Sequence, residues 1–486
     1  MKSAAYDVAI AGGGFAGLVT ATALARHGAR VCVIEPQIEG VGALRGELLH
    51  ARGVRSLENL GLADAVHAAG SVPVEGFAAY APRSETPVRL GYSNGRGIGI
   101  EHHALVSALR GGAARYPNVE LKIGQRAVDV IRQSGRVIGV RCANGEEVYA
   151  PLVVGADGRH SKLRKALGIP TSIELLSHTV AATIAGDALP EARHGHVFVG
   201  AVGPVLAYPF SRDSVRVQLD VSIRAAKESG GLIPYLVREY LPHVAPSLRE
   251  PIRAALLGRP LMAVANHAIY TEYCVTPGAA LVGDATGCSH PLTASGMTIA
   301  LADAECLGAQ LSKHGATDQA LLEYQRSRNA FVRARETFGH ALYEVFRAEE
   351  ESLRRLRDAV FEYWRSPRAR RASMDILSAE ESTMRVFVSE YLRVVGVAAR
   401  NTTPTSAGVE PLVELLVSAG RSMSFATDRV LTRIAHDRMR KLLPFPIDDT
   451  FHVTRAKKPS AERLRILLRE HSRSGARRLT PTFLDS

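Results

Sequence analysis

The chain has 486 residues, of which 46% are hydrophobic and 22% are charged. This balance is typical of a folded globular protein and excludes a disordered or collagen-like chain, and the length predicts two or three domains. The five cysteines lie far apart and form no Cys-x-x-Cys pair. We therefore expect reduced thiols and no metal site.

The formal net charge is +12, and the basic residues are not spread evenly. Nine Lys or Arg between Arg455 and Arg478 face only two glutamates, without the aromatic residues that accompany single-strand binding. We therefore expect no nucleic-acid partner, and we consider an anionic membrane surface a better candidate partner than nucleic acid. The N-terminal sequence shows no signal-peptide pattern, and no apolar run of about 18 residues occurs, so we expect a cytoplasmic protein without a spanning helix.

Residues 5–35 predict a strand, a tight glycine turn, a helix and a second strand. The turn carries Gly12, Gly14 and Gly17, and Glu35 closes the second strand. Glycines let the backbone approach a pyrophosphate, which the helix N-terminus attracts, and the Glu35 carboxylate can accept ribose hydroxyls. In this context the motif predicts a dinucleotide-binding domain.

Two further motifs place an aspartate next to a glycine at the end of a buried strand. Asp157 follows the run 152–156, and Asp284 follows the run 281–283 ahead of Pro291, Gly296 and Met297. Such a carboxylate can bond a ribityl hydroxyl, and the helix that follows can offer N–H groups to flavin carbonyls. Three motifs in this order indicate a flavin site.

The remainder of the chain divides into a β-rich part and a helical part. Residues 178–221 predict an antiparallel sheet, and the chain beyond residue 320 predicts helices. We predict an α/β protein in which a Rossmann-like FAD-binding domain is interrupted by an antiparallel β-sheet substrate domain and followed by a C-terminal helical region. The predicted FAD-binding parts are 1–75, 99–172 and 268–345, the substrate parts 76–98 and 173–267, the helical region 346–450 and the basic tail 451–486.

The motifs resemble those of FAD-dependent monooxygenases of the para-hydroxybenzoate-hydroxylase fold. Within that superfamily the chain is most similar to the squalene monooxygenase (squalene epoxidase) family. The resemblance covers roughly residues 5–365, and its strongest part joins residues 283–285 to residues 290–298. Other similar segments are residues 45–49, 57–62, 203–209, 341–346 and 356–363.

The resemblance implies that FAD is the cofactor and NAD(P)H the ultimate electron donor. Reduced flavin would react with O2 to a hydroperoxide, which transfers one oxygen atom to an apolar isoprenoid such as squalene or a related prenyl chain. Electrons reach the flavin either from transiently bound NAD(P)H or from a separate reductase, and both routes stay open. The expected cofactor-binding residues are Gly12, Gly14, Phe15, Ala16, Gly17, Glu35, Arg45, Asp157, Gly283, Asp284, Pro291, Gly296 and Met297.

Three positions depart from the family pattern near the expected flavin. A glutamine of the family is His50 here, and a tyrosine is Phe77. We expect His50, Phe77 and Tyr80 to line the flavin and substrate pocket, with His50 or Tyr80 replacing the lost polar pair. A structural role is the commoner one for a buried histidine. An arginine near the flavin phosphates is also missing, and Arg45 or His102 is expected to substitute for it.

Several alternatives remain open. The changes at His50 and Phe77 would suit a prenylated aromatic substrate, and a prenyl reductase of the same fold would need no O2. A flavin- or prenyl-binding module without turnover is a second alternative, although the retained aspartates speak against it. Apolar residues at helical spacing in segments 409–416, 430–434 and 439–443, among arginines, predict a peripheral contact with a membrane.

Overall fold

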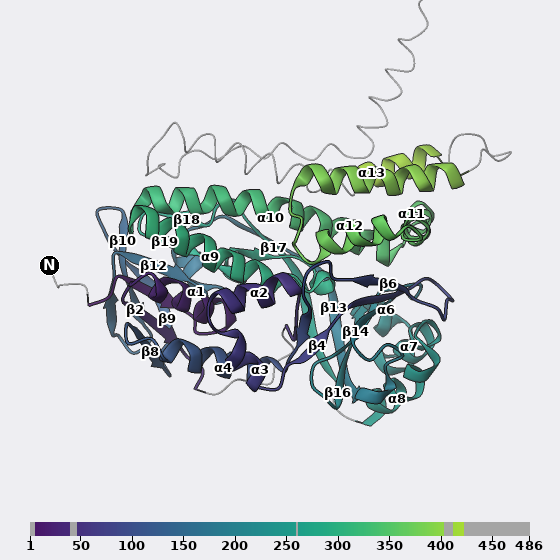
Figure 1. The fold of residues 1–486 in the computed structure, drawn as a ribbon, viewed down its shortest axis with the longest axis horizontal. Helices are drawn as coiled ribbons and strands as arrows, with labels where there is room; N and C mark the ends of the chain where they lie inside the picture. The colour runs from purple at the N-terminus through teal and green to yellow at the C-terminus, as the bar shows by residue number, and fades with distance from the viewer. Residues whose placement is uncertain (1–4, 39–45, 259–260, 403–411, 422–486) are drawn as a thin grey trace, which may run out of the picture. The chain divides into compact units, whose positions relative to one another are not determined.

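The computed structural model describes residues 5–38, 46–258, 261–402 and 412–421. The chain divides into a unit of Met1–Leu442 and a unit of Leu443–Ser486, and every described residue belongs to the first. Figure 1 shows the described helices and strands of this unit. The predicted segments 430–434 and 439–443, and the basic tail 451–486, lie outside the described residues.

A six-stranded sheet forms the nucleotide-binding part, with strand order β18-β19-β12-β1-β2-β8. All neighbours pair in parallel except β18 and β19, and the central strand β1 bonds to β2 on one side and to β12 on the other. The strands β1, β2 and β12 are buried on both faces, as is typical of parallel sheets covered by helices. The strands are β1 (Val8–Ala11), β2 (Val31–Glu35), β8 (Val119–Ile123), β12 (Leu152–Gly155), β18 (Val275–Thr276) and β19 (Ala279–Leu281).

Helix α1 is the crossover between β1 and β2, and it packs against α4 and α9. The two helices that begin at glycine-containing loops, α1 and α9, contact each other, so the first and third sequence motifs lie close in space. Helix α9 also contacts α2 and α10. The helices of this part are α1 (Phe15–Arg26), α2 (Ala51–Asn59), α3 (Ala63–Ala68), α4 (His102–Ala114), α5 (Lys162–Ala166) and α9 (Gly296–His314).

An eight-stranded sheet forms the second part, with order β20-β17-β13-β16-β15-β14-β5-β6. Its neighbours are antiparallel except β14 and β5, which pair in parallel although about 118 residues separate their starts (His194 and Gly76). The strands are β5 (Gly76–Tyr80), β6 (Val88–Gly91), β13 (Thr171–Ala185), β14 (His194–Phe198), β15 (Val205–Pro209), β16 (Ser214–Val221), β17 (Met262–Thr271) and β20 (Gly287–Cys288).

This sheet is covered on both faces. On one face lie α6 (Ile223–Glu228), α7 (Leu232–Glu239) and α8 (Pro246–Gly258), which share a core with Tyr80 and Phe198. On the other face Phe77 and Ala79 share a core with the C-terminal helices. These are α10 (Asp318–Arg347), α11 (Glu351–Tyr363), α12 (Pro367–Leu377), α13 (Met384–Asn401) and helical residues 412–421. In Figure 1 they are drawn in green, and α12 contacts β6.

Two small three-stranded sheets complete the described chain, with orders β11-β10-β9 and β3-β7-β4. Their strands are β3 (Leu48–Leu49), β4 (Val72–Val74), β7 (Gly97–Gly99), β9 (Ala127–Gln133), β10 (Arg136–Cys142) and β11 (Glu147–Tyr149). The pairing of β3 with β7 holds the segment around Gly46 beside the start of α9. A Cβ on Gly46 would lie 3.2 Å from Met297 Cε.

The predicted fold class is confirmed: a Rossmann-like α/β part, an antiparallel sheet part and C-terminal helices. The predicted strand at 180–185 is longer than expected and begins at Thr171. Its first residues are exposed and pair only with β17, so no alternation of apolar residues marks them in the sequence. The domain boundaries remain an interpretation, since the described residues form one compact unit.

Candidate functional site

The glycine turn between β1 and α1 is formed by contacts that only glycine allows. Gly12 has a φ of +107°, and a Cβ there would lie 2.5 Å from the carbonyl oxygen of Ala156. A Cβ on Gly17 would lie 1.8 Å from the carbonyl oxygen of Gly12. At Gly14, by contrast, a Cβ would meet no described atom within 4 Å. Gly14 therefore faces open space at the start of the helix.

Glu35 lies at the end of β2 and reaches the glycine turn. Its carboxylate accepts a hydrogen bond from the Gly13 amide at 2.6 Å and another from the Gln37 amide at 2.8 Å. The side chain is buried, but each carboxylate oxygen keeps a further lone pair for a ligand hydroxyl. The predicted neighbours Phe15 and Ala16 occupy the first turn of α1, where Phe15 packs in the same core as Met297.

Asp157 lies beside the glycine turn, since a Cβ on Gly12 would lie 2.9 Å from the Asp157 amide nitrogen. Its carboxylate caps helix α5: it accepts hydrogen bonds from the Lys162 amide at 2.7 Å, the Leu163 amide at 3.1 Å and the Ser161 hydroxyl. The structure thus gives Asp157 a local capping role. Its assignment to the cofactor stays a prediction.

The third motif meets the first. Gly283 has a φ of +57°, and a Cβ there would lie 2.7 Å from Ala16 Cβ. Asp284 follows it and faces the start of α9, where its Oδ1 would lie 3.7 Å from a Cβ on Gly296. The loop between them contains the single helical turn Pro291–Thr293. The structure therefore brings together Gly283, Asp284, Gly296 and Met297 with the glycine turn.

A buried ion pair that sequence analysis missed stabilises this motif. Asp303 on α9 accepts a hydrogen bond from the Gly283 amide at 2.8 Å and pairs with Arg328 on α10 at 2.9 Å. Both side chains are nearly inaccessible to solvent. Arg328 also donates to the Thr286 hydroxyl, which in turn bonds to the carbonyl oxygen of Gly283. The turn that presents Asp284 is thus held by charged hydrogen bonds.

These residues fit FAD. Neither α1 nor α9 has a side-chain hydrogen bond at its N-cap or an acidic residue in its first turn. Their first amides are therefore available to a phosphate and to a flavin carbonyl. The hydroxyl of Thr298, in the first turn of α9, is buried without a hydrogen-bond partner among the described residues. The predicted residue Arg45 lies outside the described residues, and His102 bonds the carbonyl oxygen of Gly46 at 2.9 Å.

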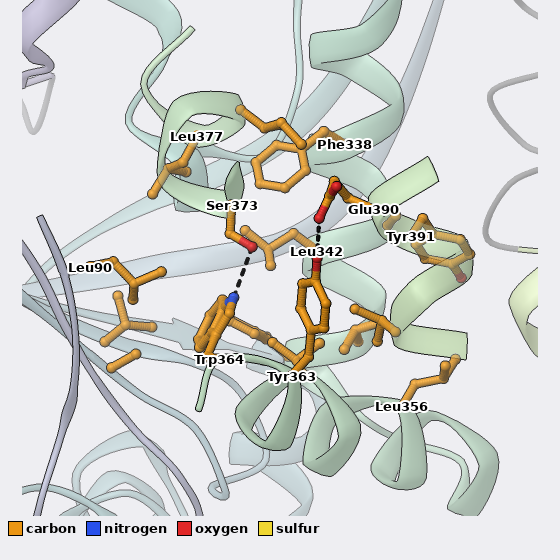
Figure 2. Close-up of a pocket in the computed structure, with 18 of the residues that line it drawn as sticks. Leu90, Phe338, Leu342, Leu356, Tyr363, Trp364, Ser373, Leu377, Glu390 and Tyr391 are labelled. Atoms are coloured by element: carbon orange, nitrogen blue, oxygen red, sulfur yellow. Dashed lines mark hydrogen bonds between the residues drawn. The ribbon is translucent and has the colours of Figure 1, made fainter. Parts of the chain in front are cut away.

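An apolar cavity lies between the sheet face of Phe77 and Ala79 and helices α10 to α13 (Figure 2). The space between these elements, including the open mouth, is about 1010 Å³. Leu292, from the loop that leads to α9, is part of its wall. Among the aromatic residues that line it are Phe338, Phe346, Trp364 and Phe387. The cavity therefore adjoins the loop of the expected flavin site.

Polar groups in the cavity are few, and they are paired. The Tyr363 hydroxyl donates to Glu390, and Trp364 Nε1 donates to the Ser373 hydroxyl at 2.8 Å (Figure 2). Glu390 also bonds Arg393 at 2.5 Å and is the one carboxylate among the lining residues described. Figure 2 shows Glu390 on the side away from Leu90, a residue of the sheet. Burial and the bond to Glu390 raise the pKa of Tyr363.

His50 is buried beside the cavity and bridges two segments. Its Nε2 lies 2.8 Å from the carbonyl oxygen of Thr293 and its Nδ1 lies 2.9 Å from the Tyr92 hydroxyl. A carbonyl only accepts, so Nε2 carries the proton and Nδ1 accepts from Tyr92. Burial lowers the pKa of His50 to about 4, so the ring is neutral. The ring centroid lies 5.8 Å from that of Phe77, which lines the cavity.

Tyr80 does not line the cavity, and the expectation that it does is wrong. Side chains alternate along β5, so Phe77 faces the cavity while Tyr80 faces the opposite core. There it stacks on Phe198 with ring centroids 4.6 Å apart. The hydroxyl that bonds His50 belongs to Tyr92, just after β6, a contact that sequence analysis missed.

Within the described ranges, no helix is both long and apolar enough to cross a membrane. The same residues contain no group of three or more His, Cys, Asp or Glu side chains placed to hold a metal ion.

Comparisons with known proteins give consistent matches. A family model described as squalene epoxidase matches residues 149–397, and one described as an NAD(P)-binding Rossmann-like domain matches residues 10–44. Squalene monooxygenase SE2 of Panax ginseng is 33% identical over 377 residues, which cover 74% of this chain and 68% of that protein. Squalene monooxygenase of Mus musculus is 30% identical, with coverage of 74% and 65%.

Two solved structures are similar in fold. PqsL, described as a probable FAD-dependent monooxygenase from Pseudomonas aeruginosa, has a TM-score of 0.62 at 26% identity, covering 70% of this chain and 96% of that one. The flavin-dependent brominase Bmp2 has a TM-score of 0.68 and covers 82% of this chain and 99% of that one. Its sequence is only 18% identical to this chain, so the similarity to Bmp2 shows a common fold and nothing more.

Proposed function

Because the chain belongs to the squalene epoxidase family of FAD-dependent monooxygenases, we propose that it epoxidises a carbon–carbon double bond of squalene or a related prenyl chain. The observation that supports this most is the apolar cavity, which shares Leu292 with the loop leading to α9. An isoprenoid chain in this cavity would lie next to the flavin site.

The reaction takes both oxygen atoms of O2. One atom enters the alkene to form the epoxide, and the other leaves as water with two electrons and two protons. The bound flavin supplies the O2 chemistry, and NAD(P)H is the proposed source of electrons, directly or through a separate reductase. The chain itself binds the cofactor through the glycine turn, Glu35 and the start of α9, and it excludes water with the aromatic wall of the cavity.

The test is an incubation of purified protein with FAD, NADPH, a flavodoxin- or cytochrome-type reductase, squalene and ¹⁸O2. We expect a product that carries one ¹⁸O atom by mass spectrometry and that is absent without O2. Omitting the reductase separates the two electron routes. A yellow protein whose flavin is reduced and reoxidised, but which forms no oxygenated product, would refute squalene as the substrate and leave the flavin site intact.

A second candidate is an isoprenoid that carries a hydroxyl group, such as a prenylated aromatic. The pair of Tyr363 and Glu390 favours it, because a carboxylate in an apolar cavity keeps lone pairs that a hydrocarbon cannot use. A site that bonds a substrate hydroxyl discriminates against the analogue that lacks it. Turnover of geranylated phenol and of squalene should be compared in the wild type and in Glu390→Gln. A preference for the phenol that Glu390→Gln abolishes would support this candidate.

We propose, in addition, that the protein contacts a membrane peripherally. Val413, Leu416 and Val417 are about half exposed and lie on one side of the helical segment 412–421, and Leu392 on α13 is 61% exposed. Vesicle flotation of Val413→Asp/Leu416→Asp tests this contact, with Val202→Asp as the control, since Val202 is similarly exposed on the substrate sheet part. Flotation unchanged by the double substitution would refute the contact at this helix.

A further inference from the structure

A buried polar cluster lies between three parts of the protein: the loop from Asp284 to the start of α9 (the flavin loop), the eight-stranded sheet and helix α10. Its centre is Asp220 at the end of β16, whose side chain is 6% exposed. Its Oδ1 lies 2.9 Å from His290 Nε2 and 3.3 Å from Asn266 Nδ2, and it also accepts from the Ser177 hydroxyl. Its Oδ2 accepts from the Tyr343 hydroxyl at 3.2 Å. Each carboxylate oxygen is therefore bonded to a different part of the protein.

The protonation of the cluster follows from its partners. His290 Nδ1 accepts a hydrogen bond from the Leu292 amide at 3.2 Å, so Nδ1 has no proton and Nε2 carries it. The Nε2–H then donates to Asp220. Burial raises the pKa of Asp220, but the hydrogen bonds from His290, Ser177 and Tyr343 outweigh it and leave the pKa below its ordinary value. Asp220 is a buried carboxylate satisfied by hydrogen bonds.

This geometry excludes a hydrolytic triad. In such a triad the histidine contacts the serine with one ring nitrogen and the aspartate with the other. Here Ser177 and Asp220 both face Nε2, with Ser177 Oγ at 3.1 Å, and that nitrogen already carries a proton. His290 cannot take a proton from Ser177. The cluster therefore has a positioning role rather than a nucleophilic one.

The two sides of Asp220 lead to the two sides of the cavity. Through His290 it holds the amide of Leu292, whose side chain lines the cavity, and the next residue, Thr293, bonds His50. Through Tyr343 it holds α10 beside Leu342, which lines the facing wall. The ring of Tyr343 also stacks on His290, with centroids 4.0 Å apart. One carboxylate thus fixes the flavin loop relative to the helix that bounds the substrate cavity.

We infer that Asp220 is a positioning residue that sets the distance between the flavin loop and the substrate cavity and thereby couples O2 consumption to product formation. The inference rests on the proposed function for its catalytic part. An oxygen-transfer site that is displaced by about 1 Å loses on the order of 100-fold in rate, so the activated oxygen would be lost as H2O2 instead.

The first test measures the loop itself, without any substrate. Hydrogen–deuterium exchange of a peptide covering residues 288–297 should be about tenfold faster in Asp220→Asn, because the variant removes the charge that holds His290. Tyr240→Phe is the matched control: the Tyr240 hydroxyl donates to the backbone carbonyl of Asp220 at 2.6 Å, not to its carboxylate. Wild-type exchange in Asp220→Asn would overturn the inference.

Substitutions at His290 separate its two bonds. Gln at this position can still donate to Asp220 but has no acceptor at the place of Nδ1. Asn can accept from the Leu292 amide but does not reach Asp220. If Asp220 anchors the loop, His290→Asn should speed the exchange of residues 288–297 more than His290→Gln does. The opposite order would show that the Leu292 bond alone holds the loop, and it would overturn the inference even if Asp220→Asn does not fold.

The second test measures coupling. In FAD-loaded Asp220→Asn and Tyr343→Phe we expect product per O2 consumed to fall about tenfold, H2O2 to rise in proportion, and NADPH-driven O2 uptake without substrate to stay within about twofold. A role in folding alone would lower FAD content and all rates together. If the wild type forms no isoprenoid product, the proposed function fails, and the exchange experiment still decides the role of Asp220.

Discussion

Replacing His50 by glutamine should make the protein less sensitive to acid. His50 is buried, and its pKa is lowered to about 4 from an ordinary value of 6.5. The unfolded chain therefore binds a proton at His50 below pH 6.5 that the folded protein does not bind until about pH 4. Since the unfolded state binds more protons in this window, stability is present above pH 6.5 and is lost as the pH falls. Glutamine does not titrate in this pH range, so His50→Gln removes this loss of stability.

The two pKa values set the magnitude. At pH 5 the wild type should lose about 2 kcal/mol through His50 relative to pH 7.5, and below pH 4 the full loss is about 3 kcal/mol. Urea unfolding followed by circular dichroism at pH 7.5, 6 and 5 should show this loss in the wild type and a correspondingly smaller one in His50→Gln. His196, also buried with a pKa lowered to about 4, is the control. His196→Gln should give a similar, additive gain in acid resistance away from the cavity. Equal pH dependence in the wild type and His50→Gln would refute the buried neutral His50.

Four further substitutions test the site. Gly14→Ala should keep the thermal unfolding midpoint and weaken FAD binding about tenfold or more, as measured by fluorescence titration. Gly17→Ala should instead destabilise the protein by about 3 kcal/mol or more, because its methyl group would overlap a carbonyl oxygen. Equal effects of the two substitutions would contradict the assignment of Gly14 to FAD binding. Asp303→Asn should cost about 3–5 kcal/mol in urea unfolding because it leaves Arg328 buried without its charge partner. A loss below about 1 kcal/mol would show that the pair is not desolvated. Ala341→Trp should fill the cavity and abolish product while FAD absorbance is retained, and undiminished turnover would place the substrate elsewhere.

The sequence predicts those parts of the site that depend on the backbone. Gly12 is required by its positive φ and Gly17 by its close contact with a carbonyl oxygen, and these requirements are visible as glycines at fixed spacing. Glu35 could be assigned because it closes the next parallel strand. The expected position of Tyr80 could also have been corrected from the sequence. Tyr80 is three residues from Phe77 on one strand, and the alternation of side chains puts the two residues on opposite faces of the sheet.

Contacts between distant segments could not be predicted. Asp220 and His290 are 70 residues apart, and nothing near either residue in the sequence marks a partner. The partner of His50 was missed for the same reason, since Tyr92 lies 42 residues away. Such pairs depend on how two sheets and a helix pack, and the local pattern of apolar residues carries no information about that packing.

The order of strands in the nucleotide-binding sheet has a consequence for how the protein is made. Strand β1 near the N-terminus has β12 as one neighbour, and β12 in turn pairs with β19, which ends at Leu281. A ribosome that adds about 5–20 residues per second needs roughly 15–55 s to travel from β1 to the end of β19. During that time the apolar strands of the emerging chain have no complete sheet to join. Synthesis of this protein should therefore depend on chaperones that cover these strands, and fragments ending before Leu281 should aggregate.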